Sequence, residues 1–293
     1  MKTNYFFTIV LFALFLGSSG ISLGQVGIGT TSPEGALDVA DDSHGIVYPR
    51  LALSNYSVQA PVINPNGGNV AVGTVVYNTA LTTNGASDVS PGLYAWNGSR
   101  WEAQFIRVDY EKFEQTSAPF RTTIRESYSD AQPGDSDNIP GLTNRTFTPE
   151  YSGFYRVEVR ANFAAGEISD FTSTDAISLA TTEGAIFFTM SGTGIDIDPS
   201  SGFYDNDEGW LYMHSYGSHS DVGSPAVVSQ GFVHYATSVY YLYLRGGHDY
   251  DFNLSNCINT GHSYFVNNGD SGTGQGYIGL EIPCSVEFTF IGD

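Results

Sequence analysis

The chain has 293 residues, with 31 Asp and Glu against 11 Lys and Arg, and its formal net charge is −20. Its hydrophobic content of 41%, including 19 Tyr and 19 Phe, is too high for an intrinsically disordered protein and is enough for a substantial core. The acidic balance excludes a nucleic-acid backbone or an anionic membrane as the main partner, because both would repel the chain.

The first 24 residues have the pattern of a secretory signal peptide. Lys2 gives a positive start, an apolar run extends from Tyr5 to Leu16, and Ser22-Leu23-Gly24 places small residues at the expected cleavage position. The alternative is a membrane anchor, but the apolar run is shorter than the ~18–20 residues that a spanning helix needs. No later stretch has that length either. We therefore expect a secreted or cell-surface protein without a transmembrane segment after cleavage.

The rest of the chain has the pattern of an all-β protein. Long helical periods are absent, and short runs rich in Tyr, Phe, Val and Thr are separated by Gly, Asn, Asp, Ser and Pro. The clearest predicted strands are 74–78, 92–96, 154–163, 185–190, 210–214, 226–235, 238–244 and 285–291.

Two of these strands differ in how their side chains alternate. Strand 154–163 alternates strictly over 155–160, so one face is expected in the core and the other in water. The core face consists of Tyr155, Val157 and Val159, and the solvent face of Arg156, Glu158 and Arg160. Strand 238–244 is apolar on both faces, so we expect it to be central in its sheet or covered by a neighbouring subunit.

Composition shifts twice along the chain. Residues 25–105 are rich in small residues, 106–146 carry clustered charges and turn formers, and the longest strands lie from about 147 onward. We therefore expect a β-rich module at 25–105, a linker with the first head strands at 106–146, and a head at 147–293.

Four sequence blocks within 25–104 occur in a familiar order. They are Gln25–Pro33 followed by Ala36–Val39, then His44–Leu51, Gly73–Thr79 and Pro91–Trp101. Together they resemble the opening of many secreted Bacteroidota surface proteins and of phage tail-fibre segments. The resemblance implies a stalk-like trimeric module on an exported protein, and not an enzyme.

Three segments of the C-terminal part form a second familiar set: Thr146–Tyr155, Val239–Phe252 and Gly279–Asp293. They resemble the globular head of the complement C-one-q and tumour necrosis factor superfamily. The chain departs from the family where His248 separates a glycine from an aspartate, and in a long insertion at about 191–224. The resemblance implies a jelly-roll β-sandwich that forms a homotrimer, with aromatic residues along the subunit axis.

Acidic residues gather in the insertion, where calcium is the best metal candidate. Calcium takes about six to eight oxygen ligands, and alternating acids in a loop can present them. The candidate ligands are Asp196, Asp198, Asp205, Asp207 and Glu208. The spacing does not fit an EF-hand, since the glycine falls one place late and no helices flank it. The alternative is a solvated acidic loop.

Aromatic residues lie in or beside the same insertion. Aromatic faces next to calcium would suit recognition of a carbohydrate or protein ligand, and the alternative is that these rings pack the insertion. The candidate residues are Phe203, Tyr204, Trp210, Tyr212 and Tyr216.

Two cysteines, Cys257 and Cys284, remain in the exported chain. An even count in an oxidising compartment favours one disulfide between them, and the alternative is two buried thiols in neighbouring strands. Six histidines are also present, and none has zinc-site spacing to a second His or a carboxylate.

Catalytic motifs are missing from the sequence. It contains no nucleophile elbow, P-loop or kinase motif. Glu167 with Asp170, or Asp205 with Glu208, could form an acid pair for glycoside hydrolysis, although such pairs arise often in so acidic a chain. We expect a non-enzymatic trimer for adhesion or ligand recognition. The alternatives are a secreted carbohydrate-active enzyme on a jelly-roll scaffold and a self-assembling extracellular filament subunit.

Overall fold

The computed structural model describes residues 24–85, 87–121, 125–126, 132–164, 177–199, 209–220, 227–228, 233–259 and 276–292. The chain divides into two compact units, Met1–Tyr48 and Pro49–Asp293. The described regular structure is β-strand apart from one 3-10 turn at Pro133–Asp135, which confirms the predicted all-β class. The predicted signal peptide lies outside the described residues, apart from its last glycine. Among the described residues, no helix is both long and apolar enough to cross a membrane.

The described part of the first unit is a small two-stranded sheet. β1 (Val26–Ile28) pairs in parallel with β2 (Leu37–Val39). Gly29 follows β1 at a φ of 78°, and a Cβ there would meet the carbonyl oxygen of Ala40 at 2.0 Å, so only glycine fits this turn. No residue in 24–48 is buried. This segment therefore has no core within a single chain.

The second unit begins with a four-stranded sheet in the order β3-β4-β5-β6. The strands are β3 (Arg50–Leu51), β4 (Val75–Asn78), β5 (Gly92–Trp96) and β6 (Trp101–Ala103). Its core cluster contains seven buried side chains: Leu53, Val70, Val76, Val89, Tyr94, Trp96 and Trp101.

Polar contacts fix the loops around this small core. Buried Asn78 accepts a hydrogen bond from the Leu53 amide at 2.9 Å and donates to the Ser90 carbonyl at 2.8 Å. Trp101 Nε1 donates to the Val58 carbonyl at 2.9 Å. The sequence blocks Gly73–Thr79 and Pro91–Trp101 therefore supply both the strands and the side chains that hold the loops.

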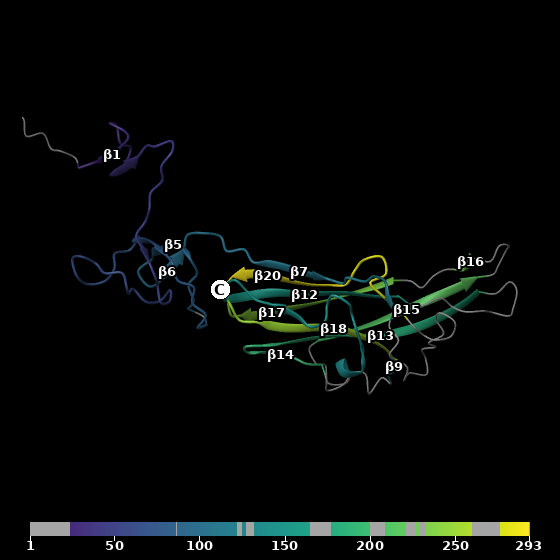
Figure 1. The fold of residues 1–293 in the computed structure, drawn as a ribbon. Coiled ribbons are helices and arrows are strands. Elements are labelled where there is room, and N and C mark those ends of the chain that lie inside the picture. The colour runs from purple at the N-terminus through teal and green to yellow at the C-terminus, as the bar shows by residue number, and fades with distance from the viewer. Residues whose placement is uncertain are drawn as a thin grey trace, which may run out of the picture. The chain divides into compact units, whose positions relative to one another are not determined.

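The remaining strands form a two-layered sandwich (Figure 1). The first sheet has β12 in the middle, with β20 and β19 on one side and β17 on the other, while β7 pairs with β20 and β8 with β19. Its strands are β7 (Tyr110–Glu114), β8 (Phe120–Arg121), β12 (Gly153–Ala164), β17 (Val233–Leu244), β19 (Tyr277–Ile278) and β20 (Ser285–Gly292).

The second sheet has the main order β10-β18-β13-β15-β16, with β9 and β11 also paired to β18 and β14 to β13. Its strands are β9 (Arg125–Glu126), β10 (Asp137–Asn138), β11 (Arg145–Phe147), β13 (Ile177–Gly192), β14 (Ile195–Ile197), β15 (Trp210–Ser220), β16 (Val227–Val228) and β18 (Tyr250–Asn259). The chain crosses between the sheets after β8, β11, β12, β16, β17 and β18, which is the connectivity of a jelly roll. This confirms the predicted jelly-roll sandwich.

The main core lies between the two sheets and contains the residues that the alternation of β12 predicts. Tyr155, Val157 and Val159 are fully buried there. The prediction that Glu158 faces water is wrong, because this side chain is only 5% exposed. It does point to the outer face of the sheet, but Arg156 and Arg160 flank it and form ion pairs with it, so their side chains cover it.

Strand β17 is not central in its sheet. Among the described strands it pairs only with β12, and its register places Tyr241 opposite Arg156. Ala236, Tyr240, Leu242 and Leu244 contribute to the main core, whereas Tyr235, Val239 and Tyr241 are 54%, 40% and 63% exposed. The prediction of a central strand is therefore wrong, and the other expectation, a covering subunit, stays a prediction.

The predicted disulfide is also wrong. No disulfide joins Cys257 to Cys284, although both lie in the described part of the chain and both are buried. Cys284 belongs to the main core between the sheets. Cys257 lies with Ala185 and Phe187 in a separate cluster. It pairs in register with Ala185 of β13, whereas the next β13 residue, Ile186, belongs to the main core, so Cys257 lies on the opposite face of the second sheet.

Candidate functional site

The acidic insertion is only partly described. Asp196 in β14 and Asp198 just after it are exposed, while Asp205, Asp207 and Glu208 lie outside the described residues. In the described part of the chain, no group of three or more His, Cys, Asp or Glu side chains could hold a metal ion. The calcium site therefore stays a prediction.

Of the aromatic residues predicted to bind a ligand, some lie within the described part of the chain and some lie outside it. Phe203 and Tyr204 lie outside the described residues. Trp210 is half-buried, donates from Nε1 to the Pro199 carbonyl at 3.1 Å and lies edge-on to Phe187 with 4.6 Å between ring centroids. Tyr212 is half-buried against the same cluster. These two rings therefore pack on the outer face of the second sheet.

Tyr216 lies further along β15, where 37% of it is exposed. Its ring is edge-on to His234, at 5.6 Å between centroids. Burial, followed by the charge of His234, lowers the pKa of nearby His214. Trp210 and Tyr212 thus pack on the cluster of Ala185, Phe187 and Cys257, and Tyr216 has a ring contact with His234 of β17.

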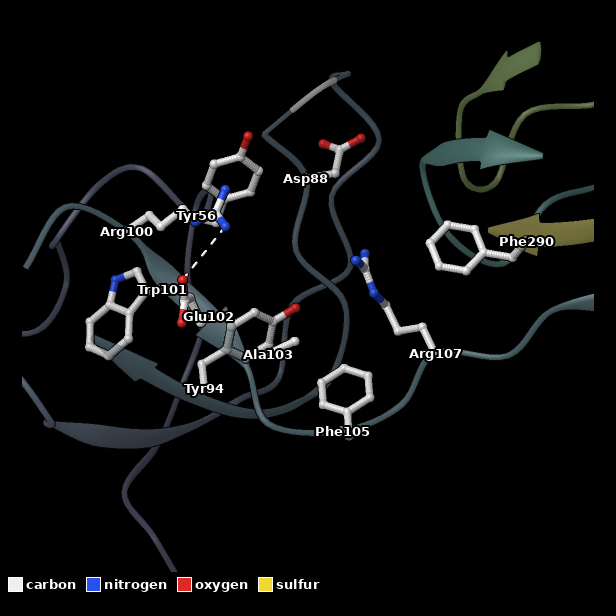
Figure 2. A pocket seen from close by; sticks show the side chains of 10 residues that line it. All are labelled: Tyr56, Asp88, Tyr94, Arg100, Trp101, Glu102, Ala103, Phe105, Arg107 and Phe290. Carbon is white, nitrogen blue, oxygen red and sulfur yellow. Dashed lines mark ion pairs between the residues drawn. The ribbon is translucent and has the colours of Figure 1, made fainter. Parts of the chain in front are cut away.

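A cavity of about 360 Å³ lies elsewhere, within the second unit (Figure 2). It combines five aromatic side chains with two arginines and two acids. Its lining residues are Tyr56, Asp88, Tyr94, Arg100, Trp101, Glu102, Ala103, Phe105, Arg107 and Phe290. Nine of the ten come from residues 56–107, and Phe290 comes from the last strand of the sandwich.

One wall of the cavity carries an ion pair at the turn between β5 and β6. Arg100 Nη2 lies 3.5 Å from Glu102 Oε1, and the Asn97 side-chain amide donates to the same oxygen at 2.8 Å. The Arg100 guanidinium also lies over the Tyr56 ring, 5.8 Å from its centroid. Both charged side chains are about half exposed, so they can meet a ligand without a large desolvation cost.

The opposite wall is formed by Arg107 and aromatic rings. The Arg107 guanidinium lies 5.0 Å from the Phe290 ring centroid and 5.8 Å from that of Tyr151. Phe105 lies edge-on to Tyr94 at 5.9 Å. Its ring also occupies the space where any Cβ on residue 92 would be, at 2.2 Å, which explains the glycine at Gly92.

Asp88 holds the upper wall of the cavity in Figure 2 to the sandwich. It accepts hydrogen bonds from the amides of Asn84 and Gly85 and from the hydroxyls of Thr82 and Ser152, the last at 2.6 Å. Burial raises the pKa of Asp88, but these four hydrogen bonds outweigh burial, and the pKa lies below its ordinary value.

Further contacts join the same loop and the segment after the cavity to the sandwich. His248 Nε2 lies 3.2 Å from the Thr83 carbonyl oxygen. The Tyr155 hydroxyl donates to Asp109 Oδ2 at 2.5 Å, and burial raises the pKa of this phenol. Hydrogen bonds to the sandwich therefore fix the loop before β5 and the segment after β6, which flank the cavity.

A second candidate surface is the outer face of the first sheet. It carries a row of ion pairs, which we call the ion-pair ladder: Lys112–Glu114, Lys112–Glu287, Arg160–Glu287, Arg160–Glu158 and Arg156–Glu158. Beside the ladder lies an aromatic stripe made of Tyr235, Val239, Tyr241 and Tyr243 on β17 and Phe154 on β12. The stripe follows the edge strand and exposes apolar side chains along its length.

The sequence did not point to the cavity. Pro91–Trp101 includes three of its lining residues, Tyr94, Arg100 and Trp101, but the tail-fibre resemblance assigns that block to a stalk. Tyr56, Asp88 and Phe290 lie at distant positions in the sequence, and no spacing rule joins them to this block. The one local signal is the dense set of aromatic and charged residues at 100–107.

Comparison with known proteins supports the N-terminal prediction. Residues 27–116 match a family model described as a phage tail like trimerisation region. The matched segment runs from β1 through the four-stranded sheet to β7. No curated protein matches the chain. The match supports a tail-fibre-like trimerising module and therefore a homotrimer.

Proposed function

We propose that the protein is an exported homotrimer whose N-terminal residues hold three chains together and whose jelly-roll heads serve adhesion or ligand recognition. The role is structural and binding, not enzymatic. The observation that carries the trimer is the match of residues 27–116 to a trimerisation region, together with the missing core of residues 24–48.

The two-stranded sheet needs a partner for physical reasons. An isolated pair of strands is marginally stable in water. Val26, Ile28 and Leu37 are 52%, 55% and 60% exposed in one chain. Two further copies of the same segment would cover these side chains and supply the core that the single chain lacks.

The sandwich offers a second surface of the same kind. The aromatic stripe exposes Tyr235, Val239 and Tyr241 along an edge strand, which is a surface that proteins seldom leave open. Its neighbour, the ion-pair ladder, satisfies its own charges within one chain. A second copy seated on the stripe would bury aromatic area without desolvating an unpaired charge.

Secretion belongs to the same proposal and rests on the N-terminal pattern of Lys2, an apolar run and small residues at the cleavage position. The resemblance of the C-terminal part to complement C-one-q and tumour necrosis factor heads agrees with the jelly-roll connectivity, and it supports a role in recognition outside the cell.

Light scattering on the mature chain, residues 25–293, tests the trimer. We expect a single species with three times the mass of one chain. A monomer across the accessible concentration range would overturn the proposal. A screen on polysaccharides for released sugar tests the non-enzymatic role, and turnover by the purified trimer would contradict it.

A further inference from the structure

We infer that the cavity formed around Tyr56, Arg100, Glu102, Phe105, Arg107 and Phe290 binds a neutral saccharide. The inference gives a ligand class to the recognition role proposed above, and it assigns that role to a place other than the acidic insertion. Its volume of about 360 Å³ is at the small end of the range for ligand sites, which suits a compact ligand.

The aromatic lining provides stacking surfaces. Tyr56, Phe105 and Phe290 are each partly exposed, so part of each ring is open to a ligand. Behind them, Tyr94 and Trp101 are only 3% and 2% exposed and belong to the core of the four-stranded sheet. The stacking rings therefore rest on a fixed base, which lowers the entropy cost of binding. The apolar C–H faces of a sugar ring pack well on such rings.

The charges of the lining select against ions. Two arginines and two acids surround the cavity, so their formal charges cancel. An anion would meet the field of a chain with a net charge of −20, and a cation would meet two guanidinium groups. A neutral polyol avoids both problems, because its hydroxyls accept from guanidinium N–H groups and donate to carboxylates.

The ion pair on the wall leaves hydrogen-bonding capacity for a ligand. Arg100 and Asn97 both contact Glu102 at Oε1, so Oε2 can accept from a hydroxyl. The guanidinium of Arg100 has five N–H donors and uses only part of them on Glu102. Asp88, in contrast, already accepts four hydrogen bonds and serves as a wall.

The arrangement also fits the proposed trimer. Each chain carries this cavity, so a trimer offers three copies of it, and simultaneous binding to a surface that carries many sugars would strengthen attachment well beyond one site. Each single site can therefore be weak. We expect a dissociation constant in the range of about 1 mM for one sugar at one cavity.

The test is a titration of the mature full-length chain with D-glucose, D-galactose, D-mannose and N-acetyl-D-glucosamine. Trp101 lines the cavity and gives a fluorescence readout, and calorimetry gives the stoichiometry. We expect saturable binding of at least one of these sugars, with one site per chain. D-Glucuronic acid, an anionic analogue of glucose, is expected to bind at least about 10-fold more weakly.

Two variants place the binding in the cavity. Glu102→Gln keeps the shape of the side chain and is expected to weaken binding about 5-fold to 10-fold, and Arg100→Gln is expected to do the same. Glu111→Gln makes the same charge change on the exposed strand β7, outside the cavity, and is the control that should leave binding unchanged. Circular dichroism confirms that all three fold.

Each outcome decides one claim. Absence of saturable binding for all four sugars, or an equal loss in Glu111→Gln, would overturn the saccharide site. Protection of the cavity by a neighbouring chain, seen as tryptophan fluorescence that depends on protein concentration but not on sugar, would also overturn it. A trimer that binds no sugar would leave the proposed trimer intact, and a monomer that binds sugar would leave the site intact.

Discussion

Replacing Leu37 by serine should weaken the trimer without affecting the fold of the sandwich. Leu37 lies in β2, opposite Val26 in the parallel pair, and 60% of it is exposed in one chain. Full burial of a leucine stabilises by about 1.5–3 kcal/mol, so covering the exposed part contributes roughly 1 kcal/mol per chain. Three chains lose this contribution together, and the loss is about 3 kcal/mol per trimer.

This loss corresponds to a change of about two orders of magnitude in the association constant, since 1.4 kcal/mol is about a tenfold change. Sedimentation equilibrium over a dilution series, with added urea if the wild-type trimer does not dissociate, measures the shift. Thr31→Ser, at an exposed polar position between the two strands, is the control and should leave association unchanged. Equal association of Leu37→Ser and the wild type would refute the reasoning that β1 and β2 obtain their core from other copies.

Three further predictions concern the second unit. Tyr241→Ser on the aromatic stripe should weaken the trimer but leave the melting temperature of the dissociated chain unchanged, because Tyr241 is 63% exposed. Val108→Ser, at a position that is 70% exposed and away from the stripe, is the control. Sedimentation equilibrium compares the association of the two variants. Asp88→Asn should destabilise the second unit by about 1–3 kcal/mol at pH 7. The pKa of Asp88 is lowered from 3.8 in the folded state, so its stabilisation is present above that value and is lost as pH falls through the folded pKa. The difference in melting temperature between the wild type and Asp88→Asn should therefore disappear well below pH 3.8. A difference that does not change with pH would contradict this prediction. Cys257 and Cys284 should both react as thiols with a disulfide reagent only after denaturation, since both are buried and burial raises the pKa of Cys284 to about 11. Fast reaction of the native protein would contradict this, and so would no reaction after unfolding without reductant.

Local patterns in the sequence predicted the strands well. The strict alternation in 155–160 placed Tyr155, Val157 and Val159 in the core, because the period of a strand is fixed by its backbone. The same pattern could not show that Glu158 is covered, since that depends on two long arginine side chains that reach over it.

Features that depend on which strands become neighbours were harder to predict. Cys257 and Cys284 fit a disulfide by count and compartment, but the connectivity of the jelly roll puts them on different faces of a sheet. The doubly apolar strand 238–244 could not be assigned to the centre or the edge without its pairing partners. The cavity unites Tyr56, Glu102 and Phe290, which only the folded second unit brings together.

If the N-terminal residues gain their core from two other copies of the chain, a cryo-electron microscopy map of the purified mature protein will show it. We expect three chains in which Val26, Ile28 and Leu37 of each lie buried against the same segment of its neighbours. A map in which these side chains face solvent, or in which the chain is a monomer, would contradict it.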